Sequence, residues 1–346
     1  MTAGTLTLPR PDDWHLHLRD GDEMRAVLDF TVQRFARAIV MPNLKPPVTT
    51  VAQARAYRER ILAAVPAKYR FEPLMTLYLT EETAPAEIDN ARASGFISGV
   101  KLYPAGATTY SEAGVRTIAN VSGVLERMER CGLPLLVHGE VTDAGVDVFE
   151  REQRFIETVL APLVARYAGL KVVLEHITTR TGAEFVRSAR AGVAATITPQ
   201  HLLLNRNALL AGGLRPHHYC LPVLKEERDR QALVQAAISG NPKFFLGTDS
   251  APHARSAKES ACGCAGVFSA HAAIELYAEA FEAAGALGRL PGFASEFGAD
   301  FYGLPRNSDS ITLRKESWRA PSHYAFGTET LVPLRAGETV AWRLAP

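Results

Sequence analysis

The sequence predicts an α/β fold, a (β/α)8 (TIM) barrel with its functional site at the C-terminal mouth of the strands. Two observations lead to this fold class. Short apolar runs alternate along the chain with longer stretches of helical periodicity, and several runs are apolar throughout. Such runs are typical of parallel strands that helices cover on both faces. The chain of 346 residues fits a single barrel domain over residues 1–346.

Eight strands are expected along the chain. In order they are WHLHL (14–18), RAIVMPN (37–43), EPLMTLYL (72–79), ISGVKLY (97–103), LPLLVHGE (133–140), LKVVLEH (170–176), VAATITP (193–199) and KFFLGTD (243–249). The clearest helical stretches between them are 50–65, 111–132 and 180–192. Ser111 is the expected N-cap of the second helix, and Gly132 is its expected stop. From about residue 310 the tail is expected to form a short irregular or β extension.

Composition excludes several classes of function. The net charge of +1 gives no reason to expect nucleic acid or an anionic membrane as a partner. The N-terminal residues lack the basic and apolar regions of a signal peptide. No run approaches the roughly 18 apolar residues that a membrane span needs.

The cysteines indicate a reducing, cytoplasmic setting. Four of them, Cys131, Cys220, Cys262 and Cys264, are too few for a disulfide framework in a chain of 346 residues. Cys262 and Cys264 form a pair that could bind a metal ion, but no second pair lies nearby in the sequence. A structural zinc site is therefore not expected there.

The first expected strand carries two histidines, His15 and His17, two residues apart. Side chains at this spacing point to the same face of a strand, so both imidazoles are expected together, with Arg19 beyond them. The apolar residues of the stretch are expected on the other face: Trp14, Leu16 and Leu18. The pair could supply two metal ligands, or it could be two unrelated polar residues.

Four more strands also end in polar residues. These are Lys101, His138, His176 and Asp249. The C-terminal ends of barrel strands meet at one mouth, where active sites lie. Lysine and aspartate are rarely buried unpaired, so core packing explains these positions poorly. Four histidines and one aspartate can bind one or two zinc-like ions.

Lys101 does not fit a metal site as an ammonium, because a cation has no lone pair to donate. Burial near metal ions would favour the neutral amine. A neutral amine can add CO2 to give a carbamate, whose two oxygens could bridge two metals. The competing role is a Schiff-base lysine, as in a barrel aldolase. The histidines and Asp249 favour the metal interpretation.

Motifs over roughly residues 8–342 resemble those of a known family. HLHLR, GVKLYP, VHGE, LEHIT and GTDSAPH are similar to the metal-dependent amidohydrolase superfamily. WHLHLRDG, MPNL, NRN followed by RPHHYCLP, GTDSAPH and KESACGCAG are similar, more narrowly, to the short bacterial (class II) dihydroorotases. The resemblance implies reversible cyclisation of N-carbamoyl-L-aspartate to L-dihydroorotate by a metal-bridging hydroxide, in pyrimidine biosynthesis. It also implies a homodimer with two Zn²⁺ ions per subunit.

The resemblance implies two metal positions that share one side chain. His15, His17 and Asp249 would hold the more buried ion, and His138 and His176 would hold the second. Lys101, as N6-carboxylysine, would bridge the two ions. Asp249 would also be catalytic, since it can take a proton from the hydroxide and pass it to the ring nitrogen.

Five further residues would contact the substrate. Arg19, Asn43 and His253 would bind its carboxylate, and the backbones of Leu221 and Ala265 would contact the dihydropyrimidine ring. A guanidinium suits an anionic substrate because it can pair bidentately with a carboxylate. Taken alone, Arg19 could equally form a surface salt bridge, Asn43 could be a turn residue and His253 a loop residue.

Thr108 and Thr109 would lie on a loop that closes over the substrate, where their hydroxyls would bond it and exclude water. An ordinary connector after a strand would have the same composition. The other histidines are expected to be loop or packing residues, namely His201, His217, His218, His271 and His323. Of these, His217 and His218 are expected to lie near Leu221.

Besides the Schiff-base lyase, two alternatives remain open at this point. Hydantoinases, dihydropyrimidinases and allantoinases share the superfamily, but they generally carry a β-sandwich built partly before the first barrel strand. Here the HxH pair begins at residue 15, which leaves no room for such strands. A non-catalytic relative would be expected to have lost metal ligands, and all six positions are present.

Overall fold

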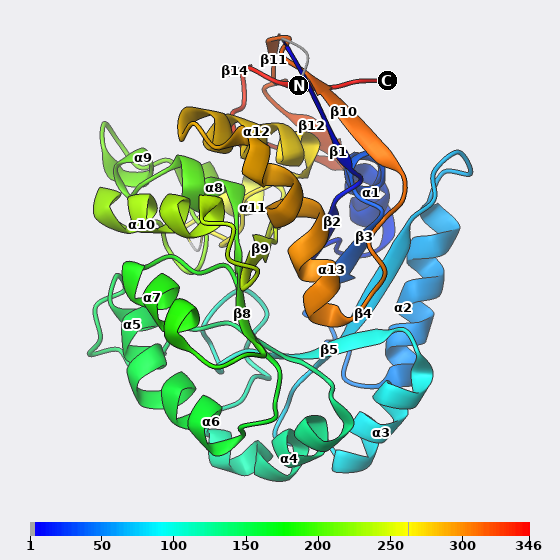
Figure 1. Ribbon diagram of the computed structural model, residues 1–346, viewed down its shortest axis with the longest axis vertical. Coiled ribbons are helices and arrows are strands. Elements are labelled where there is room, and N and C mark those ends of the chain that lie inside the picture. The colour runs from blue at the N-terminus through cyan, green and yellow to red at the C-terminus, as the bar shows by residue number, and fades with distance from the viewer. Residues whose placement is uncertain (1–3, 262) are drawn as a thin grey trace.

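An eight-stranded parallel sheet forms the centre of the computed structural model, which describes residues 4–261 and 263–346 (Figure 1). Its strands are β2 (Asp12–Leu16), β3 (Arg37–Val40), β4 (Glu72–Tyr78), β5 (Ile97–Leu102), β6 (Leu135–Val137), β7 (Val172–Leu174), β8 (Val193–Ile197) and β9 (Phe244–Leu246). They pair in chain order, and a bridge between Leu16 and Ser250 nearly closes the sheet into a barrel. All eight predicted strands are confirmed, most of them shorter than expected.

Helices surround the barrel (Figure 1). They are α1 (Gly21–Arg34), α2 (Val51–Ala64), α3 (Pro85–Ser94), α4 (Ser122–Cys131), α5 (Arg151–Phe155), α6 (Ala161–Arg166), α7 (Arg180–Ser188), α8 (Pro199–Leu203), α9 (Asn207–Leu210), α10 (Glu227–Ile238), α11 (Arg255–Lys258), α12 (Ala273–Ala283) and α13 (Phe297–Tyr302). Shorter 3-10 and π turns are η1 (Ile118–Val121), η2 (Ile156–Leu160), η3 (Pro216–His218), η4 (Ala270–Ala272), η5 (Leu287–Arg289) and η6 (Gly292–Glu296). Within the described residues, none of the helices is long and apolar enough to cross a membrane.

The three predicted helical stretches have different outcomes. The first is α2, which begins in a capping box at Thr50, and the third is α7, which ends earlier than predicted. The second prediction is wrong at its start, because α4 begins at Ser122 and η1 precedes it. The Ser111 hydroxyl instead bonds the backbone N–H and carbonyl of Thr108 within the preceding loop. The predicted stop at Gly132 is confirmed, with a left-handed φ of 71°.

An apolar layer fills the barrel interior. It consists of Trp14, Ile39, Met41, Leu74, Leu136, Val173, Ala194 and Phe245, with Ala299 of α13. The prediction that Trp14 would share a face with Leu16 and Leu18 is wrong. Leu16 and Leu18 belong to the core between the strands and the surrounding helices, whereas Trp14 lies inside the barrel. The register of β2 against β3 shifts between Asp13 and Leu16. A bulge of this kind interrupts the alternation of side chains along a strand.

Helix α13 closes the barrel interior at Gly298, where its backbone meets the indole of Trp14. A Cβ at Gly298 would lie 1.9 Å from Trp14 Nε1. Trp14 is held in place, because its ring stacks on that of Tyr302 at 4.7 Å. We expect Gly298→Ala to lower the free energy of unfolding by about 1–3 kcal/mol through overpacking, as measured by urea denaturation.

The matched control for this change is Gly123→Ala in α4. There the nearest atom to an added Cβ is Cγ of Pro85 at 3.8 Å, an ordinary contact. The control is expected to leave stability unchanged or to raise it slightly, because alanine favours helix more than glycine. Equal unfolding free energies for Gly298→Ala and the wild type would contradict the packing argument.

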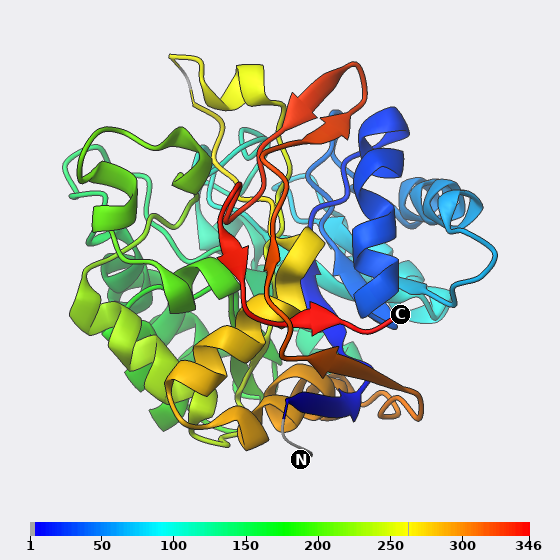
Figure 2. The ribbon, with the colours of Figure 1, turned by 90° about the horizontal axis from the view of Figure 1, so that it is seen from above.

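The tail forms the β extension that the sequence predicts from about residue 310. Its strands are β10 (Ser310–Arg314), β11 (Trp318–Arg319), β12 (Tyr324–Phe326), β13 (Glu329–Leu331), β14 (Thr339–Val340) and β15 (Arg343–Leu344). Strand β10 pairs with β15 and with β1 (Thr5–Pro9), as Figure 2 shows near the N-terminus. The expectation that no sheet strand fits before the barrel therefore needs correction, since β1 is such a strand.

Candidate active site

The six predicted metal ligands lie together at the mouth of the barrel. His15 lies in β2 and His17 just after it, Lys101 lies in β5, and His138, His176 and Asp249 follow β6, β7 and β9. All six side chains are buried. The ring of His176 lies 4.9 Å from that of His15 and 4.9 Å from that of His138, measured between centroids. The barrel thus brings together residues that are more than two hundred positions apart.

His15, His17 and Asp249 form a compact set of three ligands. Oδ1 of Asp249 lies 3.4 Å from Nε2 of His15 and 3.1 Å from Nε2 of His17, and the two nitrogens are 3.3 Å apart. Burial alone would raise the pKa of Asp249, but the hydrogen bond from His17 and the neighbouring charges lower it to about 2. Burial and the charge of Lys101 hold the pKa of His15 well below its usual value. An ionised carboxylate and neutral imidazoles are what a metal ion requires.

Strained backbone aims three of the site side chains. Arg19, His176 and Asp249 have φ of 63°, 42° and 45°, and they are three of the five non-glycine residues with positive φ in the described chain. Two of these conformations are held by hydrogen bonds: the N–H of His176 donates to Thr196 Oγ1 and the N–H of Asp249 to the carbonyl of His15. Strain that the fold maintains in this way is concentrated at functional sites.

Buried acceptors orient two of the histidines. Nδ1 of His15 lies 2.5 Å from Oε2 of Glu175, which also accepts from Thr196 Oγ1. Nε2 of His138 lies 2.8 Å from Oε2 of Glu140. Such partners fix the ring and its tautomer, and so prepare the other nitrogen to bind a metal.

Sequence reasoning missed Glu175 and Glu140. A signal was present, because both acids lie in the strand-end motifs LEHIT and VHGE. Glu175 directly precedes His176, and Glu140 is separated from His138 by one residue. Asn43, predicted to bind substrate, also orients a ligand: its Oδ1 lies 2.8 Å from Nδ1 of His17. Its side chain nevertheless lines the central cavity.

Lys101 is completely buried, and Nζ has no hydrogen-bond partner among residues 4–261 and 263–346. Burial lowers the pKa of Lys101 to about 8, although Glu175 and Asp249 oppose this shift. An unpaired buried ammonium is costly, so the position favours a neutral amine or a modified one. Nδ1 of His176 is likewise buried without a partner in the described chain. These two buried nitrogens without hydrogen-bond partners lie among imidazoles and a carboxylate. The arrangement fits a metal centre with a carboxylated lysine.

A small cavity opens directly onto this cluster. Its lining consists of His15, His17, Arg19, Asn43, Tyr103, Thr108, Thr109, His138, His176, Leu221, Asp249, Ala251, Ala265 and Gly266. Every residue predicted to contact substrate is in this set except His253. Lys101 does not line the cavity, which disfavours a Schiff base between its amine and a bound carbonyl compound.

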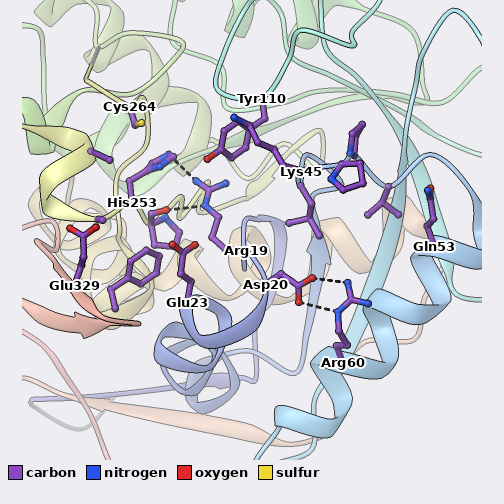
Figure 3. A pocket seen from close by; sticks show the side chains of 18 of the residues that line it. Arg19, Asp20, Glu23, Lys45, Gln53, Arg60, Tyr110, His253, Cys264 and Glu329 are labelled. Atoms are coloured by element: carbon purple, nitrogen blue, oxygen red, sulfur yellow. Dashed lines mark hydrogen bonds and ion pairs between the residues drawn. The ribbon is translucent and has the colours of Figure 1, made fainter. Parts of the chain in front are cut away.

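Arg19 lines both this cavity and an outer pocket, which Figure 3 shows. Its Nε donates to the carbonyl of Pro252 at 2.9 Å, and its Nη2 lies 2.9 Å from Nε2 of His253. That nitrogen of His253 is also 3.0 Å from the carbonyl oxygen of Ala265. His253 therefore contacts Arg19 from the outer side, so the two predicted residues do lie together.

The loop that carries Thr108 and Thr109 bridges the two sides of the cavity. Thr109 Oγ1 donates to the carbonyl of Ala265 at 3.3 Å, and Nδ2 of Asn43 donates to the carbonyl of Thr109 at 3.1 Å. On the outer side, Nζ of Lys45 lies 4.1 Å from the ring centroid of Tyr110. The loop therefore covers the cavity in this structure.

The remaining histidines lie outside the cluster, as predicted. His201 is buried and bonds Thr198 Oγ1 and the carbonyl of Pro222. The other four pair with local groups, namely His217 with Glu259, His218 with Ala208, His271 with Leu334 and His323 with Ser322. Cys262 lies outside the described residues, so the predicted absence of a zinc site at the cysteine pair is not tested.

Comparisons with known proteins agree with the geometry. Residues 11–318 match the model of the amidohydrolase family. A dihydroorotase from Laribacter hongkongensis is 65% identical over 342 residues, which are 99% of each chain. The crystal structure of dihydroorotase from Campylobacter jejuni superposes with a TM-score of 0.91 at 35% identity, over 100% of this chain and 99% of that one. Dihydroorotase from Saccharomyces cerevisiae, in complex with 5-fluoroorotic acid, has a TM-score of 0.90 at 33% identity, over 99% and 100% of the two chains. Because these matches span the full length of both chains, this chain belongs to the dihydroorotases of the amidohydrolase family.

Proposed function

We propose that the chain catalyses the reversible cyclisation of N-carbamoyl-L-aspartate to L-dihydroorotate, a step of pyrimidine biosynthesis, with two zinc ions per subunit. The observation that supports this most is the cluster of four imidazoles, the Asp249 carboxylate and the buried Lys101 amine at one end of the barrel. Such a donor set suits zinc, while membership of the dihydroorotases supplies the reaction.

In this proposal His15, His17 and Asp249 would hold one ion, and His138 and His176 would hold the other. Lys101, as N6-carboxylysine, would be a ligand to both. When bound, a pair of such ions lowers the pKa of a bound water and polarises the amide carbonyl. The chain contributes the orientation of each ligand, since Glu175 and Glu140 fix the rings of His15 and His138.

Asp249 moves the proton. In the hydrolytic direction its carboxylate takes a proton from the attacking water and gives it to the ring nitrogen as the C–N bond breaks. In the direction of cyclisation the same carboxylate takes the proton from the carbamoyl nitrogen and returns it to the departing oxygen. The hydrogen bond from His17 and the neighbouring charges lower the pKa of Asp249, so its carboxylate is ionised at neutral pH.

Arg19, Asn43 and His253 bind the substrate carboxylate. The guanidinium of Arg19 is fixed through Nε by the carbonyl of Pro252, so its other nitrogens are held in place for an anion. The backbones of Leu221 and Ala265, which line the cavity, provide polar groups for the amide edge of the ring.

Thr108 and Thr109 close the cavity and bond the substrate. Replacing both with alanine is expected to lower kcat/KM by about tenfold or more, because each hydroxyl lost leaves a buried partner unpaired. Steady-state kinetics with L-dihydroorotate would measure this. Thr158→Ala is the control, since that hydroxyl bonds the Arg154 carbonyl on an exposed helix. A double variant with wild-type kcat and KM would contradict the role of the loop.

The function itself is tested by incubating the purified chain with L-dihydroorotate and following N-carbamoyl-L-aspartate. Turnover should disappear after treatment with a chelator and return when zinc and bicarbonate are added. Absence of turnover in the metal-replete, bicarbonate-supplemented protein would contradict the proposal. Hydantoins and dihydrouracil would then be the next substrates to assay.

The proposal also includes the assembly and the location of the enzyme. A homodimer follows from the family that the sequence resembles, and light scattering coupled to size-exclusion chromatography would detect twice the mass of one chain. A single-chain mass would contradict it. A cytoplasmic location, expected from the few cysteines, stays a prediction.

A further inference from the structure

The KESACGCAG motif contains a buried lysine for which the reaction has no use. Lys258 ends the short helix α11, and its side chain is 3% exposed. Its Nζ donates three hydrogen bonds to backbone carbonyls, at 2.7 Å to Tyr219, 2.8 Å to Cys264 and 2.7 Å to Gly266. An ammonium has three N–H groups and no acceptor, so each of its hydrogens has a carbonyl partner here.

These three carbonyls belong to two loop segments that border the central cavity. Leu221 lies two residues after Tyr219, and Ala265 lies between Cys264 and Gly266. Both Leu221 and Ala265 line the cavity. One segment follows β8 and the other follows β9, so the two segments belong to no common strand or helix.

A backbone hydrogen bond and an apolar cluster that includes Cys220 and Val267 also join the two segments. The N–H of Gly266 donates to the carbonyl of Tyr219 at 3.0 Å, the same oxygen that accepts from Lys258. A Cβ at Gly266 would lie 2.5 Å from the carbonyl oxygen of Ala251, so the backbone here is packed too closely for a side chain. The ammonium also draws together carbonyl dipoles that would otherwise repel one another.

The environment of Lys258 differs from that of Lys101, because all three N–H groups of its ammonium have carbonyl partners despite the burial. Burial lowers the pKa of Lys258 to about 8, and the nearby charge of Arg19 acts in the same direction. A buried charge is retained at moderate cost only where its hydrogen bonds are complete. This cost suggests that the lysine is used for the geometry it imposes.

We propose that Lys258 is a positioning residue that fixes the spacing between the backbones of Leu221 and Ala265, and so sets how tightly the substrate ring is held. The inference rests on the proposed function. Lys258 does not line the cavity, and its three hydrogen bonds go to none of the proposed metal ligands. Its loss should therefore weaken binding of the ring and leave metal content unchanged.

The test compares Lys258→Met with Lys243→Met. Nζ of Lys243 also donates to three carbonyls, those of Val186, Arg187 and Ala189, but at the start of β9, the end of the strand away from the mouth. Lys258→Met is expected to raise KM for L-dihydroorotate and Kd for 5-fluoroorotate about tenfold, the cost of roughly one lost charged hydrogen bond. Its kcat should change less. Lys243→Met should lower the thermal stability without changing KM or Kd.

Each outcome decides between positioning and general stabilisation. Unchanged KM and Kd in Lys258→Met would overturn the inference, as would an equal rise in Lys243→Met. Should Lys258→Met fail to fold, Lys258→Arg replaces it, because a planar guanidinium keeps the charge but cannot direct its donors to the same three carbonyls. A wild-type Kd for 5-fluoroorotate in Lys258→Arg would then overturn the inference. Wild-type protein that neither turns over L-dihydroorotate nor binds 5-fluoroorotate would contradict the proposed function instead.

Discussion

Replacing Lys101 with alanine is expected to lower kcat/KM for L-dihydroorotate by about three orders of magnitude or more, with loss of bound metal. Under the proposed function, the buried Lys101 amine would become a ligand shared by the two metal ions. Metal ions supply several kcal/mol of transition-state stabilisation, which corresponds to a loss of this size. Steady-state kinetics and metal analysis by mass spectrometry on the same preparation would measure both effects.

A second variant and a control separate the effect of the lysine carbamate from the effect of the lysine charge. Lys101→Arg keeps a cation but offers no neutral amine to CO2, so it should be as inactive as the alanine variant. Lys171→Ala is the control, because Lys171 Nζ bonds the carbonyl of Phe301 at 2.8 Å, far from the mouth. Near-wild-type metal content and rate in Lys101→Arg would argue against a carboxylated lysine.

Asp249→Asn is expected to reduce kcat about a thousandfold in both directions, in line with the usual contribution of general acid–base catalysis. The amide has the same size as the carboxylate, and its oxygen can still approach a metal, but it cannot accept the proton. More metal should therefore be retained than in Lys101→Ala. Initial rates from L-dihydroorotate and from N-carbamoyl-L-aspartate would show whether both directions fall equally.

The control for this change is Asp300→Asn, which alters an exposed carboxylate paired with Arg306. It should leave kcat unchanged. If Asp249→Asn retained kcat within tenfold of the wild type while binding its metal, another group would have to carry the proton.

The strands and the ligand cluster were predictable because the signals are local. A continuous apolar run marks a strand buried on both faces, and a polar residue at its C-terminal end needs only the barrel topology to reach the mouth. His138 and His176 illustrate this. His138 directly follows β6, and one residue separates His176 from the end of β7. The roles assigned to them remain predictions until the metal content is measured.

Other features were not visible because they depend on contacts distant in sequence. Ser111 has the local signature of an N-cap, but its hydroxyl bonds Thr108 in a loop that folds back over the cavity. Glu175 is an acid beside a histidine in the sequence, and only the barrel brings its carboxylate to His15, 160 residues away. Strand alternation failed at Trp14 because a register shift against β3 intervenes.

The sequence by itself determined the barrel, the six candidate ligands and the family, because apolar periodicity and motif spacing are properties of the chain. Tertiary structure alone decided which groups orient those ligands, such as Glu175 for His15 and Asn43 for His17. It also decided that Lys258 joins the two loops beside the cavity. The physical reason is that a buried polar group takes its partner from whatever the fold places within hydrogen-bond distance, and no local pattern encodes that choice.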